Sequence, residues 1–451
     1  MDLTRGGITR PMLLFAGPMI AGNLLQQCYN IADTLIVGRA LGASALASVG
    51  FSFTLMTFLT SVLLGLCMGS GALWSMLYGA EREEELKRCL FASFVFIGAV
   101  AVLLNVGVLA LLEPVMTLLR IPAGAWDETR AYLRVVLLGV CFTFLYNYFA
   151  CLLRSVGNSV APLAFLAVST VLNIGLDLWF VLGLGWGVAG AAWATVLSQA
   201  ASCVFVLAML RHRSMPIRLE PDKLSPALMG KVLLFGLTPF LTISLDSVIL
   251  IVLNAVLQSR GGPGTGDTLV SCNTIVQSYM LLITMPMGGI TGGCQPIVSY
   301  NYGAGNTARI RKAIRYVLLL CLAFTAGMTV ITFTLSPLFV RLFTSDQALV
   351  PLTVKYIRRF CLCAVPLAAQ YTAVDMSTAL GRVRHSLFCS VNRKVWFTAL
   401  TLALPVLLGA ADAAFWAEPI VDLGCAAITS CLVFTTLPDF LRRRELEQTL
   451  S

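Results

Sequence analysis

Long apolar runs alternate with short polar segments along the whole chain. Each run is long enough to cross a bilayer as a helix, the form in which a spanning segment bonds its own backbone groups. The runs at 89–112 and 187–210 contain no charged residue, whereas the last run holds Glu418 and Asp422. We predict twelve spans, at 12–38, 44–78, 89–112, 131–153, 161–183, 187–210, 231–256, 268–300, 316–338, 356–379, 388–410 and 414–438.

The composition agrees with a membrane protein of many spans. Of 451 residues, 58% are hydrophobic and 12% are charged, about half the charged share of an ordinary soluble protein. A soluble multidomain protein, a disordered chain and a disulfide-rich secreted fold are therefore excluded. The first apolar stretch soon meets Asn23 and Asp33, so we interpret it as a retained helix and not as a cleaved signal peptide.

The basic residues predict the orientation. The chain has 31 Lys and Arg against 22 Asp and Glu, a net charge of +9, and most basic residues lie in short connectors. They favour both termini in the cytoplasm, including Arg393 and Lys394 as part of loop 10/11. This pattern explains the positive charge without a nucleic-acid partner. Loop 9/10 is the exception, because it places four basic residues on the outer side: Arg341, Lys355, Arg358 and Arg359.

The two halves of the chain form a repeat. A shift of 224 positions places Gly65 on Gly289, Gly69 on Gly293 and Tyr78-Gly79-Ala80 on Tyr302-Gly303-Ala304. We predict an N-lobe at 1–210, a cytoplasmic linker at 211–230 and a C-lobe at 231–451. Six helices in each lobe give halves of the same orientation, related by a pseudo-twofold axis along the membrane normal. Transporters built in this way bind substrate between their halves.

Two acids inside the first half are candidates for a coupling-ion site. Asp33 and Asp177 lie at similar depth, roughly 8–9 Å below the outer end of their helices. Asn173 precedes Asp177 by one turn, and Thr195 lies at a comparable level in helix 6. These oxygens suit Na⁺ or a proton, since buried acids in membranes are costly and usually functional. The alternative is that these side chains only join neighbouring helices by hydrogen bonds.

The second half lacks this set, because the repeat aligns Asn254, Phe397 and Thr401 with Asp33, Asn173 and Asp177. Ion coupling is therefore expected in the N-lobe. Prolines inside helices are possible hinges, and buried acids of the second half could face a substrate cavity, although packing explains each equally well. The candidates for the cavity or its gate are Pro18, Asn23, Gln26, Asp246, Asn254 and Asp375.

The sequence contains little that could support catalysis. Its only histidines are His212 and His385, and it has no P-loop, HExxH motif or nucleophile elbow. The 14 cysteines lie mostly in apolar runs, where they act as small hydrophobic residues. We predict no enzyme and no cofactor, so transport would have to use an ion gradient.

Three stretches carry a family resemblance. Three segments are involved: PMIAGNLLQQCYNIADTLIVGRALGASALASVG at 18–50, LLRSVGNSVAPLAFLAVSTVLNIGLDLWFVLGLGWGVAGAAWATVLSQ at 152–199 and GGCQPIVSYNYGAGN at 292–306. They resemble sequences of the multidrug and toxic compound extrusion (MATE) family. The resemblance implies a monomeric exporter of small organic, often cationic compounds in the cytoplasmic membrane, driven by Na⁺ or H⁺. The segment GAADAAFWAEPIVDLG departs from the family pattern between helices 11 and 12.

The resemblance also implies which residues form the coupling-ion site. In the DinF-like branch, the N-lobe cation site has an Asp in helix 1, an Asn-x3-Asp in helix 5 and a Thr in helix 6. Asp33, Asn173, Asp177 and Thr195 stand at these positions. The alternatives are a lipid-linked saccharide flippase, which few Lys or Arg in helix interiors disfavour, a narrow-substrate metabolite exporter, and an integral-membrane enzyme or channel.

Overall fold

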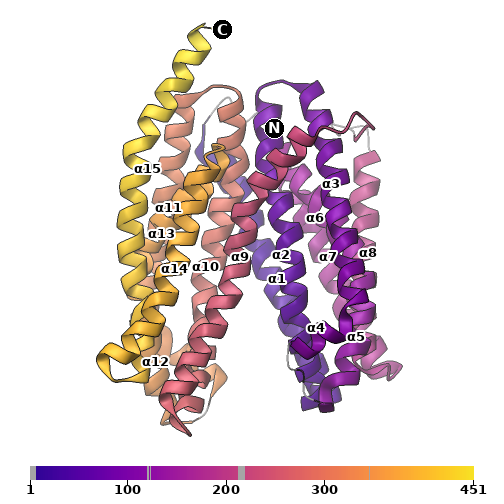
Figure 1. Cartoon of the computed structure of the whole chain (residues 1–451), viewed down its shortest axis with the longest axis vertical. Coiled ribbons are helices and arrows are strands. Elements are labelled where there is room, and N and C mark those ends of the chain that lie inside the picture. The colour runs from indigo at the N-terminus through magenta and orange to yellow at the C-terminus, as the bar shows by residue number, and fades with distance from the viewer. Residues whose placement is uncertain (1–6, 119–120, 122, 212–218, 345, 451) are drawn as a thin grey trace. The chain divides into compact units, whose positions relative to one another are not determined.

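The computed structural model describes residues 7–118, 121, 123–211, 219–344 and 346–450, and within them helices dominate and no strand occurs. The helices of the first half are α1 (Thr9–Leu41), α2 (Ala43–Gly79), α3 (Glu83–Ala110), α4 (Leu112–Leu118), α5 (Trp126–Leu138), α6 (Val140–Ser155), α7 (Val160–Asp177) and α8 (Gly187–Arg211). Those of the second half are α9 (Pro226–Gly261), α10 (Thr265–Gly303), α11 (Thr307–Phe343), α12 (Leu349–Phe360), α13 (Ala364–Ala379), α14 (Val383–Leu408) and α15 (Ala417–Leu450) (Figure 1).

Most of these helices can cross a membrane. Among the described residues, nine are long and apolar enough, and the pair α5–α6, bent by 45°, makes ten. The helix α1 and the pair α12–α13 correspond to the remaining two predicted spans. The helix α1 carries several amides, and α12 and α13, with 12 and 16 residues, are each too short to span a membrane alone. Each predicted span thus corresponds to one helix or one broken helix.

Packing divides the chain into two units that differ from the predicted lobes at two places. The first unit contains Ala21–Phe240, and the second contains Leu3–Ile20 and Leu241–Ser451. The start of α1 thus belongs to the second unit and the start of α9 to the first. Both divisions fall just after a proline within the helix, Pro18 in α1 and Pro239 in α9. Of the predicted linker, residues 212–218 lie outside the described residues.

Glycines explain how α9 packs in the first unit. A Cβ atom built on Gly65 of α2 would lie 2.6 Å from the backbone N of Phe240, and one on Gly69 would lie 2.4 Å from the backbone N of Gly236. Real Cβ atoms do not approach a backbone so closely, and only glycine permits this contact. The Gly-x3-Gly pair of α2, Gly65 and Gly69, therefore serves helix packing.

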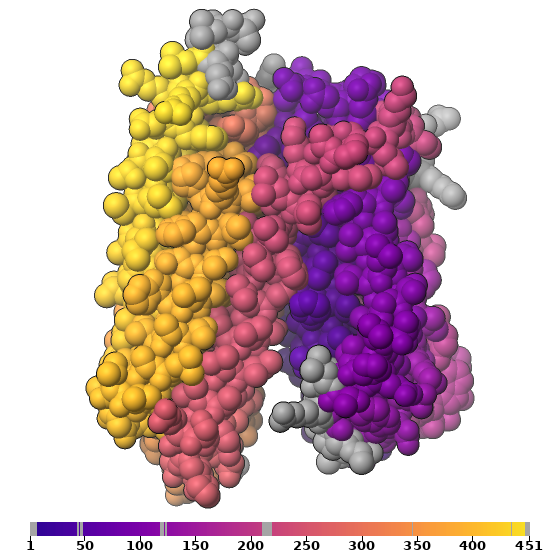
Figure 2. Space-filling view, in the orientation of Figure 1, coloured from indigo at the N-terminus to yellow at the C-terminus, as the bar shows by residue number. Residues whose placement is uncertain are grey.

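The second unit repeats this arrangement with α10 and α1. A Cβ atom on Gly289 would lie 2.9 Å from the Cα atom of Ile20, and one on Gly293 would lie 3.0 Å from the carbonyl O of Phe15. Further helices of this unit, α11, α13, α14 and α15, pack side by side. Of these, α14 and α15 form part of its surface (orange and yellow in Figure 2).

Two irregular segments were not predicted. The helix predicted at 131–153 is broken at Gly139, between α5 and α6. The helix predicted at 161–183 changes from α to π geometry after Asp177, at Leu178–Gly183. Such single-turn π segments are frequent at functional sites, and this one begins directly after a candidate site residue.

The connection between α14 and α15, where the sequence departs from the family pattern, forms a short 3₁₀ helix at Ala411–Trp416. Asp412 in this helix accepts a bond from Arg359 Nη1 at 3.0 Å and lies 3.8 Å from Lys355 Nζ. The unusual segment is therefore tied to α12 by ion pairs.

Candidate cation site and a polar cavity

Three helices of the first unit supply the candidate cation site. Asp33 comes from α1, Asn173 and Asp177 from α7, and Thr195 from α8, which packs along α7. All four side chains are buried, with Asn173 and Asp177 fully enclosed. Asp33 and Asp177 lie within electrostatic reach of each other. The structure thus brings the two acids into one buried region, as their matched depths led us to expect.

Tyrosine hydroxyls complete the site, and sequence reasoning missed them. Tyr29 Oη donates a hydrogen bond to Thr195 Oγ1 over 3.1 Å, joining α1 to α8. Tyr132 of α5 also interacts with Thr195 and lies within electrostatic reach of Asp33. Tyr29 precedes Asp33 by four residues and therefore shares its helix face, a spacing that could have revealed it.

Several buried polar atoms of the candidate site form no hydrogen bond with the described residues. Within the described part of the chain, Asp33 Oδ1, both carboxylate oxygens of Asp177, and Oδ1 and Nδ2 of Asn173 are buried without a hydrogen bond. A buried polar group left unpaired costs about 1–3 kcal/mol. Hydrogen bonds between the described helices therefore leave five polar atoms of this cluster unused.

The donor types indicate which ligand fits. The site offers two carboxylates, one amide oxygen and one hydroxyl, which are hard oxygen donors. Over the described residues, no group of three or more His, Cys, Asp or Glu side chains could hold a metal ion. An alkali cation held by these oxygens, or a proton on one carboxylate, fits the residues present. Their role in ion binding stays a prediction.

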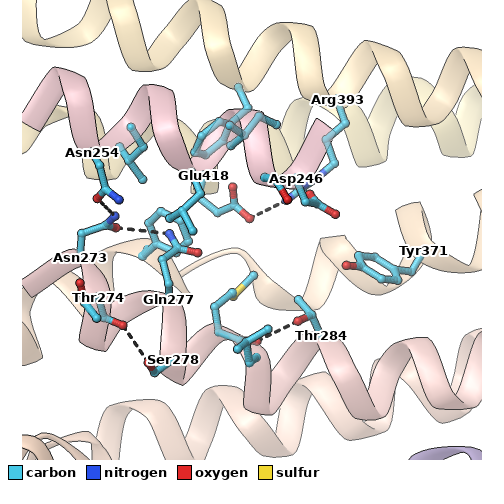
Figure 3. A pocket seen from close by; sticks show the side chains of 18 residues that line it. Asp246, Asn254, Asn273, Thr274, Gln277, Ser278, Thr284, Tyr371, Arg393 and Glu418 are labelled. Atoms are coloured by element: carbon cyan, nitrogen blue, oxygen red, sulfur yellow. Dashed lines mark hydrogen bonds and ion pairs between the residues drawn. The ribbon is translucent and has the colours of Figure 1, made fainter. Parts of the chain in front are cut away.

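The second unit contains a partly open cavity of about 470 Å³ with polar and apolar lining residues (Figure 3). One wall carries three amides in a chain. Asn273 Nδ2 donates to Asn254 Oδ1 at 2.7 Å, and Gln277 Nε2 donates to Asn273 Oδ1 at 3.3 Å. The cavity is also lined by Phe360 and Phe397, so amide and aromatic contacts are both available to a small molecule.

A buried ion cluster forms part of the cavity wall. Arg393 Nη2 of α14 lies 2.5 Å from Glu418 Oε1 and 3.0 Å from Asp422 Oδ1 of α15. Lys394 pairs with Asp246 of α9 at the same wall. The assignment of Arg393 and Lys394 to a cytoplasmic loop was therefore wrong, since both lie inside α14 and are buried by their pairing with acids of other helices.

The structure separates the predicted cavity candidates. Asp246 and Asn254 line the cavity of the second unit, whereas Asp375 in α13 is not among its lining residues and interacts with Thr291 of α10. In α1, Pro18 belongs to the segment packed in the second unit, while two amides belong to the first unit: Asn23 and Gln26.

We compared the chain with models of known protein families, and one model matches it. The MatE family model matches residues 18–179 and again residues 242–401, which together are more than half of the chain. The chain belongs to the MatE family. The two matches begin at 18 and at 242, an offset of 224 that confirms the internal repeat.

Curated relatives of this family member carry multidrug names. The Probable multidrug resistance protein YpnP of Bacillus subtilis is 26% identical over 360 residues, which are 79% of each chain. The Multidrug export protein MepA of Staphylococcus saprophyticus is 26% identical over 442 residues, or 95% of this chain and 94% of that one. The chain is a multi-pass membrane protein of a transporter family and not an enzyme, as predicted.

Solved structures share the fold. A MOP superfamily transporter from Pyrococcus furiosus matches with a TM-score of 0.90 at 21% identity, over 98% of both chains. A multidrug resistance MATE family transporter in an outward-facing conformation matches with a TM-score of 0.88 at 22% identity, again over 98% of both. The predicted fold class, an all-α polytopic membrane protein with two similar halves, is confirmed.

Proposed function

We propose that this chain is a secondary-active exporter of small organic, often cationic compounds, of the DinF-like branch, which exchanges them for Na⁺ or H⁺. One observation carries the proposal: Asp33, Asn173 and Asp177 hold five buried polar atoms with no hydrogen-bond partner among the described residues. The multidrug names of the relatives support the substrate class. The protein would work as a monomer in the cytoplasmic membrane with both termini inside.

Two like-charged acids in a buried site explain the coupling. A cation between Asp33 and Asp177 would remove their mutual repulsion and hold α1 against α7. The helix α1 continues through Pro18 into a segment that packs in the second unit. Cation binding would therefore bias the bend of α1, and substrate would favour the opposite state. Such opposed preferences are what alternating-access antiport requires.

The cavity of the second unit would contribute to substrate binding. Its amide chain from Asn254 to Gln277 offers hydrogen bonds, and Phe360 and Phe397 offer apolar contact. This mixture fits an organic molecule with polar substituents, and a narrow-substrate exporter would use the same groups. It disfavours a flippase for anionic lipid-linked saccharides, because two acids neutralise the Arg393 guanidinium in the cavity wall.

Ethidium efflux from a pump-deficient bacterium tests the proposal. Wild type should expel ethidium from energised cells, and Asp33→Asn and Asp177→Asn should both abolish efflux at equal membrane levels. Asp127→Asn is the matched control, because Asp127 is an exposed acid in the first turn of α5, and it should retain wild-type efflux. Wild type that expels no organic cation would overturn the drug-export proposal. Equal efflux by wild type and both site variants would overturn the site.

Proteoliposomes separate the two coupling ions. The purified protein is reconstituted with ethidium outside inside-out vesicles, and an outward Na⁺ gradient or an outward H⁺ gradient is imposed alone. A response only to Na⁺ assigns the oxygens of Asn173 and Thr195 as cation ligands together with the acids. A response only to H⁺ leaves protonation of the acids as the coupling step. Uptake that neither gradient drives would refute antiport.

A further inference from the structure

The basic residues of loop 9/10 line a groove in the second unit. It has a volume of about 870 Å³ and lies where α11 ends and α12 begins. The helix α12 lies at the opposite end of this unit from the C-terminal end of α15 (Figure 1), where Arg442, Arg443 and Arg444 are found. The groove is thus a basic surface on the side where the positive-inside rule predicts few basic residues.

Three cations line this groove. Arg341 is exposed and forms no ion pair within the described ranges. Lys355 Nζ lies 3.8 Å from Asp412 Oδ2, a loose pair. Asp346, one residue before the lining residue Gln347, accepts a bond from a backbone N–H of the loop at 2.8 Å. Counting Asp412 as well, two acids stand against the three lining cations. The groove therefore carries a net positive charge.

Arg358 has a structural contact as well. Its Nη2 donates to the carbonyl O of Phe333 at 2.7 Å. Residue 337, one turn further, is proline and cannot supply the N–H that this carbonyl would otherwise receive. Arg358 thus has a packing reason to be present, whereas Arg341 forms no side-chain hydrogen bond or ion pair with the residues that the structure describes.

The first half of the chain provides an internal comparison. The shift of 224 aligns Arg341 with Thr117, Lys355 with Ala131 and Arg358 with Arg134. Arg358, which donates to the carbonyl O of Phe333, is matched by a cation, whereas Arg341 and Lys355 are not. The corresponding region of the first unit instead contains an ion pair of Glu113 with Arg130, at 2.6 Å. Arg341 and Lys355 are therefore not required by the shared fold.

Apolar side chains beside the groove indicate the class of ligand. Leu338, Leu342 and Phe343 at the end of α11 are 63%, 78% and 52% exposed, as side chains facing lipid are. We propose that the groove binds the phosphodiester headgroup of an anionic phospholipid, with Arg341 and Lys355 as its cationic contacts and the acyl chains along the end of α11. The shared chemistry is that of phosphate, and Arg binds phosphate oxygens through its planar fork of donors.

Native mass spectrometry of the full chain in a neutral detergent tests this site. The probes are phosphatidylglycerol, phosphatidylcholine of the same acyl chains, and inorganic phosphate. Each basic residue near a headgroup contributes about fivefold in affinity. Wild type should bind phosphatidylglycerol above phosphatidylcholine, Arg341→Gln should lose about fivefold, and Arg341→Gln/Lys355→Gln about 25-fold.

Matched variants separate a site from general charge. Arg260→Gln removes another exposed cation, in the last turn of α9 of the same unit, and should bind as wild type does. Arg341→Lys should retain most of the binding. Unchanged binding by the double variant, or an equal loss with Arg260→Gln, would overturn the proposal. Full displacement of the lipid by millimolar phosphate would assign the groove to a free anion instead.

Discussion

Replacing Arg393 with leucine should strongly destabilise the second unit, because two buried carboxylates lose their counter-ion. The side chains of Arg393, Glu418 and Asp422 are 12%, 7% and 0% exposed, so water cannot replace the guanidinium. Removing one partner of a buried ion pair costs about 3–5 kcal/mol. For a unit of this size, each kcal/mol lowers Tm by about 2–4 °C, and we expect a drop of roughly 6–20 °C.

The adjacent lysine provides the matched control. Lys394 pairs with Asp246, whose side chain is 57% exposed, and this acid can be solvated when the lysine is removed. Lys394→Met should therefore cost only about 0–1 kcal/mol. The triple variant Arg393→Leu/Glu418→Gln/Asp422→Asn removes the charges together and should recover most of the loss, since a buried ion cluster and its neutral replacement are often similarly stable.

Thermal unfolding in detergent, followed by fluorescence-detected size-exclusion chromatography, measures these differences. The expected order of Tm places wild type and Lys394→Met highest, the triple variant below them, and Arg393→Leu lowest. If Arg393→Leu loses no more stability than Lys394→Met, the carboxylates do not depend on the guanidinium. If the triple variant is as unstable as Arg393→Leu, the loss comes from packing and not from unpaired charge.

Two further substitutions test packing and the site. Gly69→Val should destabilise the protein by at least about 1–3 kcal/mol and lower its Tm accordingly, because a Cβ atom would lie 2.4 Å from the backbone N of Gly236. Gly107→Ala should leave Tm unchanged, since a Cβ atom there has nothing within 4 Å. Equal effects of the two variants on Tm would disprove the close contact. Tyr29→Phe removes the donor to Thr195 and should weaken cation-driven efflux by a few fold, about 1 kcal/mol. Wild-type efflux by this variant would remove Tyr29 from the site.

Helix positions could be predicted from the sequence because lipid imposes both length and polarity. The predicted span 187–210 matches α8 (Gly187–Arg211) almost residue for residue, since glycine and arginine mark its ends. The predicted span 316–338 was too short, because α11 runs over Thr307–Phe343. Its first turns lie outside the apolar run and carry basic residues. A prediction from hydropathy places the helix boundary where charged residues begin, and therefore leaves these turns out.

The ion cluster could not be predicted in the same way. Arg393 stands close to the start of a predicted span, where a basic residue is normally part of a connector. Its partners Glu418 and Asp422 lie 25 and 29 positions away on another helix, so no local spacing indicates the pairing. Only packing of α14 against α15 brings these charges together.

The cation site was partly predictable for a different reason. Asp33 and Asp177 belong to different helices, but depth in a membrane is a coordinate that the sequence supplies directly at 1.5 Å per residue. The sequence does not reveal how each helix is rotated about its axis, and this rotation decides which residues of two helices face each other. Tyr132 was therefore missed, because its contact with Thr195 depends on how α5 is turned toward α8.

The start of α1 packs in the second unit and the start of α9 packs in the first, and this affects how the protein folds during its synthesis. Residues 9–20 of α1 pack in the second unit, against Gly289 and Gly293 of α10. During translation this segment is made before α10, so its contacts with α10 form only after α10 has been synthesised. The first unit likewise stays incomplete until residues 226–240 of α9 emerge. Neither half can finish folding before the ribosome has passed the midpoint of the chain, so assembly of the two units is linked in time.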